Sequence, residues 1–79
     1  MRLPRDLSGS DLIKVLCKHY GYSQVDKEGS HVLLQTKQLR HHRIAIPEHK
    51  SLRLGTLNAI LNAVARIQGI EKAEILDKL

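Results

Sequence analysis

The sequence predicts an α+β fold in which two amphipathic helices cover one face of a three-stranded antiparallel sheet. Three observations support this fold class. Apolar residues recur at helical spacing in two separate stretches, three short β-rich segments lie between those stretches, and glycine or proline marks the boundaries. The predicted order is α-β-β-β-α with a short C-terminal helix, and residues 1–79 are expected to form one domain.

The first helix is expected over residues 9–20, after a flexible arm at residues 1–7. Ser8 is a suitable N-cap, and Asp11 follows three positions later, as in a capping box. Gly21 suits the left-handed position that follows many helices. One apolar stripe runs along the predicted helix and comprises Leu12, Ile13, Leu16, Cys17 and Tyr20.

Three β-type segments follow, at residues 22–27, 31–36 and 41–46. Gly29 can supply the positive φ that a tight turn between the first two segments needs. Pro47 is expected to end the third segment. Short loops between consecutive strands indicate an antiparallel meander.

The middle strand carries the histidine of greatest interest. Side chains alternate along a strand, so His31 shares a face with Leu33 and Gln35, whereas Val32 and Leu34 lie on the other. Two apolar residues against one favour Val32 and Leu34 inside. His31 is therefore expected on the open face of the sheet, beside the glycine turn.

The second helix is expected to begin between Ser51 and Thr56 and to end at Gly69. A third, short helix is expected over residues 71–79. The predicted buried face of the second helix comprises Leu57, Ile60, Leu61 and Val64.

Composition and charge limit the possible functions. The formal net charge of +5 favours a polyanionic partner. The single cysteine, Cys17, cannot form an internal disulfide, which favours a reducing compartment. No signal peptide or membrane-length apolar segment is visible, so a cytoplasmic location without membrane attachment is expected.

Basic side chains gather in the predicted loops and strand ends. Lys50 and Arg53 precede the second helix, whose free N–H groups attract phosphate. No three or four ligands stand at metal-site spacing, so neither a metal nor another cofactor is expected. The candidate RNA-binding residues are Lys50, Arg53, His49, Arg40, Arg43 and Lys27.

Three motifs together resemble the HicA toxin family. They are Gly29-Ser30-His31, the segment from Ile46-Pro47-Glu48-His49 through Gly55-Thr56-Leu57 to Ile60-Leu61, and Ser8-Gly9 followed by Leu12-Ile13. The resemblance implies a fold like the double-stranded-RNA-binding domain, cleavage of mRNA, and neutralisation by a HicB antitoxin. It also implies that His31 is the catalytic residue, because it is the histidine of the first motif.

The chemistry of RNA is consistent with such a role for His31. RNA carries its own nucleophile, the 2′-hydroxyl, so metal-independent cleavage needs only proton transfer and charge stabilisation. An imidazole, with an ordinary pKa near 6.5, can donate or accept a proton near neutral pH.

Two other functions fit the same residues. The chain can be a non-catalytic RNA-binding domain of the same fold, or a protein-interaction module that docks a partner on its open face or sheet edge. In either case His31 is an ordinary polar residue on the surface of a strand.

Overall fold

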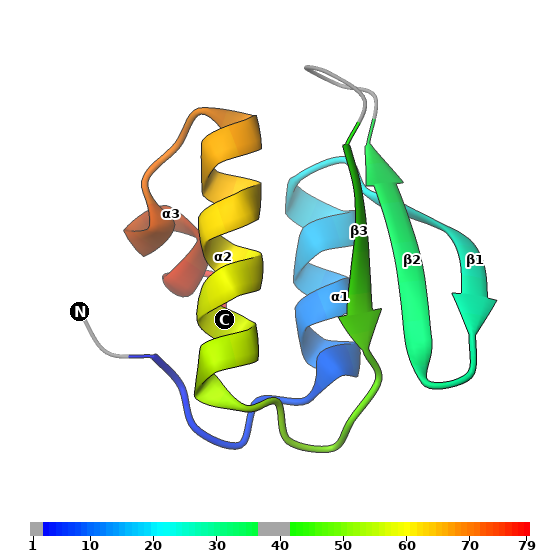
Figure 1. The fold of residues 1–79 in the computed structure, drawn as a ribbon. Coiled ribbons are helices and arrows are strands. Elements are labelled where there is room, and N and C mark those ends of the chain that lie inside the picture. The colour runs from blue at the N-terminus through cyan, green and yellow to red at the C-terminus, as the bar shows by residue number, and fades with distance from the viewer. Residues whose placement is uncertain (1–2, 37–41) are drawn as a thin grey trace.

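The computed structural model describes residues 3–36 and 42–79. It contains two long helices, a three-stranded sheet and one short helix (Figure 1). The predicted α+β class and element order are confirmed. In chain order the elements are α1 (Gly9–His19), β1 (Ser23–Glu28), β2 (His31–Thr36), β3 (His42–Pro47), α2 (Leu54–Gln68) and α3 (Lys72–Leu76).

The sheet is an antiparallel meander in the order β1-β2-β3. His31, the first residue of β2, pairs with Glu28 on one side and with Pro47 on the other. A bulge in β1 between Gln24 and Asp26 interrupts the regular pairing further along. His31 therefore has a paired residue of β1 on one side and a paired residue of β3 on the other.

The core lies on one face of this sheet. Val32 and Leu34 of β2 are buried, His31 is exposed, and Leu33 is partly exposed, as the alternation predicted. Because α1 and α2 both contact β3 and supply buried leucines, the two helices cover the same face (Figure 1). No helix formed by residues 3–36 and 42–79 covers the opposite face.

Helix α1 begins at the predicted residue, Gly9, and ends one residue before the predicted end, at His19. The backbone N–H of Asp11 donates to Ser8 Oγ at 3.0 Å, and Gly21 has a φ of 71°. Leu12, Leu16 and Tyr20 are buried, and the other two members of the stripe, Ile13 and Cys17, are half-buried against the core.

Helix α2 begins inside the predicted interval, at Leu54, and ends at Gly69 in the left-handed conformation. Leu57, Ile60, Leu61 and Val64 are buried, as predicted. No helix within residues 3–36 and 42–79 is long and apolar enough to cross a membrane.

Some predicted boundaries were wrong, and strand β1 spans Ser23–Glu28 instead of residues 22–27. Strand β3 includes Pro47 rather than stopping before it, because the last residue of an edge strand can lack an N–H without breaking the ladder. Helix α3 has five residues instead of the nine predicted over 71–79. After Leu76 the chain tightens into turns in which Lys78 N donates to Ile75 O and Leu79 N donates to Leu76 O.

Candidate functional site

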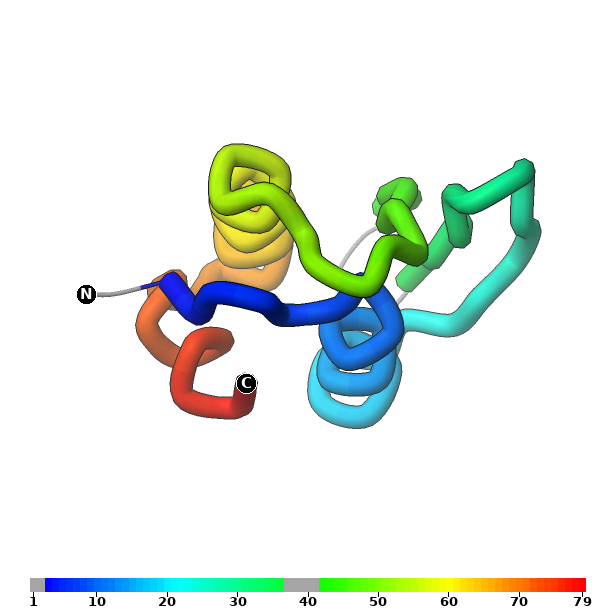
Figure 2. Tube along the Cα trace, turned by 90° about the horizontal axis from the view of Figure 1, so that it is seen from below, coloured from blue at the N-terminus to red at the C-terminus, as the bar shows by residue number. Residues whose placement is uncertain are grey.

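One end of the molecule collects most of the residues of interest. The β1–β2 turn, the β3–α2 loop and the N-terminal ends of α1 and α2 all lie at the lower end of Figure 1. Figure 2 looks directly at this end, with the β3–α2 loop running between the sheet and α2. We call this region the turn end.

His31 stands at the turn end, on the exposed face of β2. The two-residue turn Gly29-Ser30 precedes it, and Gly29 has a φ of 58°. Glycine at the first central position with positive φ is the arrangement expected of a tight hairpin turn. No side chain occupies the Gly29 position, and a Cβ there would contact nothing within 4 Å.

Three backbone hydrogen bonds tie the turn end together. Glu48 N donates to Ser30 O at 2.6 Å, which fixes the start of the β3–α2 loop against the hairpin turn. Gly9 N donates to His49 O at 2.9 Å, and Leu52 N donates to Leu7 O at 2.7 Å. The segments that carried the three sequence motifs are therefore in direct contact.

The predicted basic residues of the β3–α2 loop face solvent. His49, Lys50 and Arg53 are all exposed, and Arg53 is the N-cap residue of α2. The N-cap residue of α2 makes no capping hydrogen bond with its side chain, so the first backbone N–H groups of the helix can donate hydrogen bonds to an anion.

The other predicted basic residues are placed differently. Lys27 forms an ion pair of 2.8 Å with Glu48, so its ammonium group already has a carboxylate partner. Arg43 donates to Gln35 Oε1 and lies four residues before Pro47 in β3, roughly 13 Å along the strand from the level of His31. Arg40 lies outside the described residues.

Sequence reasoning missed an acidic residue, Glu28, which pairs directly with His31 across β1 and β2. Residues paired in an antiparallel ladder have side chains on the same face. A signal was present, since a two-residue turn at Gly29-Ser30 makes the flanking residues Glu28 and His31 partners. The open face beside His31 is therefore acidic on its β1 side.

A second histidine lies at the opposite end of the sheet. His42 Nδ1 shares a hydrogen bond of 2.7 Å with the Tyr22 hydroxyl, and the two rings pack edge to face. The pKa of His42 lies below its ordinary value, mainly because the ring is partly buried and also because the positive charge of Arg66 is nearby. Its burial and the neighbouring positive charge thus favour the neutral form of the His42 imidazole.

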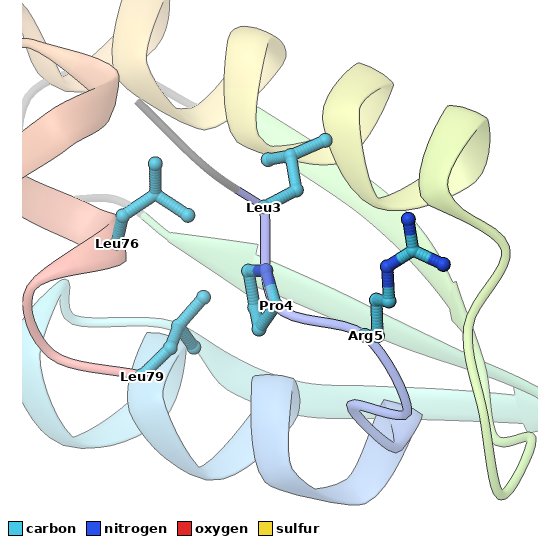
Figure 3. A pocket seen from close by; sticks show the side chains of 5 residues that line it. All are labelled: Leu3, Pro4, Arg5, Leu76 and Leu79. Carbon is cyan, nitrogen blue, oxygen red and sulfur yellow. The ribbon is translucent and has the colours of Figure 1, made fainter.

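A hollow of about 600 Å³ lies between the N-terminal arm and the C-terminal segment that includes the end of α3 (Figure 3). It is lined by Leu3, Pro4, Arg5, Leu76 and Leu79. A smaller hollow of about 340 Å³ lies beside the start of α2 and includes Arg5 and Arg53. Neither hollow contains His31, which stands on an open surface.

Comparison with known proteins gives one match. A family model described as the HicA toxin of bacterial toxin–antitoxin systems matches residues 9–65, which is more than half of the chain. The matched span begins at the first residue of α1 and ends within α2, and so includes the whole sheet. Neither the curated proteins nor the solved structures give a match.

Proposed function

The chain belongs to the HicA toxin family of bacterial toxin–antitoxin systems, and we propose that it is an endoribonuclease that cuts mRNA. In this proposal His31 is the catalytic histidine, and the reaction uses the 2′-hydroxyl of the RNA as nucleophile without a metal ion. The products are an RNA ending in a 2′,3′-cyclic phosphate and an RNA beginning with a 5′-hydroxyl.

The placement of His31 is the observation that best supports the proposal. Its imidazole is exposed on the sheet face that is free of helices in the described part of the chain, directly after a turn whose first residue has no side chain. An RNA backbone can approach this position closely, whereas a buried histidine would be out of reach. Within the described residues, no hydrogen bond or ion pair occupies the His31 side chain.

In this proposal the β3–α2 loop binds the phosphates of the RNA. Lys50, Arg53 and His49 are exposed there, beside the uncapped N-terminus of α2. Their charges and the helix dipole attract phosphate independently of base sequence. Because the acidic Glu28 lies on the other side of His31, we expect the RNA backbone to enter from the loop side.

The partner expected from the family is a HicB antitoxin, and the place of action is the cytoplasm, where mRNA is available. A toxin with a net charge of +5 is readily neutralised by an acidic protein that covers the same phosphate-binding surface.

The test is incubation of the purified protein with a long RNA in the presence of a metal chelator. Cleavage should persist, and the new ends should be 2′,3′-cyclic phosphate and 5′-hydroxyl. Binding without cleavage would favour the non-catalytic RNA-binding alternative. Cleavage that stops when metal is removed, or that leaves a 5′-phosphate, would contradict the mechanism.

A further inference from the structure

The proposed reaction requires two proton transfers. A proton must leave the 2′-hydroxyl as its oxygen attacks phosphorus, and another must reach the 5′-oxygen as the P–O5′ bond breaks. The attacking and leaving oxygens lie on opposite sides of the phosphorus, so one imidazole cannot serve both in the same step. A second proton-transfer group is therefore needed near His31.

Among the described residues, two carboxylates of β1 and one directly after β3 lie in the segments next to His31. Two are already engaged: Asp26 Oδ1 accepts a hydrogen bond of 2.7 Å from Lys27 N, and Glu48 Oε1 binds Lys27 Nζ at 2.8 Å. Glu28 is exposed, and no hydrogen bond or ion pair holds its carboxylate within the part of the chain that the structure describes.

The sheet register places Glu28 beside His31. The two residues flank the two-residue turn and are directly paired, which puts their Cβ atoms roughly 5 Å apart on the same face. Lys27, by contrast, pairs with the buried Val32, so its side chain lies on the same face of the sheet as Val32. The Glu48 carboxylate that binds Lys27 is therefore directed to that face as well. Glu28 and His31 can thus flank one phosphate.

Building on the proposed function, we infer that Glu28 is the general base of the reaction and His31 is the general acid. The Glu28 carboxylate takes the proton from the 2′-hydroxyl, the 2′-oxygen bonds to phosphorus, and the P–O5′ bond breaks. The His31 imidazolium gives its proton to the leaving 5′-oxygen. Water restores the two protonation states after the products leave.

The first test compares Glu28→Gln with Asp26→Asn. Both remove one carboxylate from β1, but Asp26 pairs with Leu33, two positions further from the turn than the Glu28–His31 pair. Glu28→Gln should lower kcat by about 100-fold or more, since general base catalysis is typically worth that much. KM should stay the same or fall, because a negative charge beside the RNA is removed. Asp26→Asn should cleave close to the parental rate.

The second test separates base from acid. In a substrate with sulfur in place of the 5′-oxygen at the mapped cleavage point, the leaving group needs no protonation, since a thiol is a far stronger acid than an alcohol and leaves as the thiolate. His31→Ala should regain most of its activity on this substrate, whereas Glu28→Gln should not.

Each failure has a distinct meaning. A Glu28→Gln protein that cuts ordinary RNA at the parental rate overturns the inference but leaves the ribonuclease function intact. Rescue of Glu28→Gln by the sulfur substrate, without rescue of His31→Ala, reverses the two roles and also overturns it. A parental protein that cuts no RNA removes both proposals.

Discussion

Gly9, the first residue of α1, lies directly against the backbone of Pro47, the last residue of β3. A Cβ atom on Gly9 would collide with the carbonyl oxygen of Pro47. The same glycine donates its N–H to His49 O. The start of the first helix is thus held against the loop that carries the proposed phosphate-binding residues, at a separation that only glycine permits.

Gly9→Ala should therefore destabilise the protein by about 1 to 3 kcal/mol, the usual cost of forcing extra atoms into a packed site. Gly55→Ala is the matched control, because a Cβ on Gly55 contacts nothing within 4 Å and alanine favours helix. Urea unfolding of both variants provides the measurement. Equal stability of Gly9→Ala and the parental protein would mean that the contact is looser than described.

The Tyr22–His42 pair predicts a dependence of stability on pH. Because the pKa of His42 is lowered in the folded state, the unfolded chain takes up a proton at higher pH than the folded chain does. Stability should fall as the pH drops below about 6.5, the ordinary histidine value, through the folded pKa of His42. Above that range both states are neutral and His42 contributes no pH dependence.

Urea midpoints between pH 5 and 7.5 measure this effect, with His42→Gln as the non-titrating comparison. The variant should show a smaller loss of stability on acidification than the parental protein. Identical pH profiles for the two proteins would show that His42 is not the responsible group.

The β3–α2 loop predicts how RNA affinity depends on salt. Lys50→Ala with Arg53→Ala should weaken binding of all RNA sequences alike and reduce the log–log salt slope by about 1 to 2 units, for two lost phosphate contacts. Binding is best measured in a His31→Ala background, where the RNA stays intact. The control is Lys14→Ala with Lys18→Ala, which removes two exposed charges from α1. An unchanged slope in the loop variant places the RNA elsewhere.

The family assignment predicts a protein partner. A tagged copy expressed together with the small protein encoded beside it should purify as a stable complex in which RNA cleavage is blocked. Hydrogen exchange should be slowed at residues 48–53 in the complex. Purification without any product of the neighbouring gene would contradict this prediction.

The sequence predicted the elements well because their signals are local. Ser8, Gly21, Gly29 and Gly69 mark helix ends and a turn through their own backbone chemistry, and the structure confirms all four. The open-face position of His31 also followed from alternation within one strand. The sequence signals were weakest at the end of α3 and at Pro47, where contacts with other segments determine the boundary of the element.

The neighbours of His31 were harder to predict because they depend on pairing between segments. Lys27 is a basic residue in the sequence, yet its charge is taken up by Glu48, which lies 21 positions later. Glu28 became a candidate only when the register placed it opposite His31. The pattern of residues along one β-strand does not show which residues of another segment lie beside it.

Cleavage by His31→Ala is the most direct test of the proposed function. The variant should cut RNA about 100- to 10,000-fold more slowly, because it lacks the proton-transfer group. Its stability should change by no more than about 0.5 kcal/mol, since the side chain is exposed, and it should still bind RNA. His19→Ala, which removes another exposed histidine, is the matched control and should cut normally. A folded His31→Ala protein that cuts RNA at the parental rate, with contaminating nucleases excluded, would contradict the account.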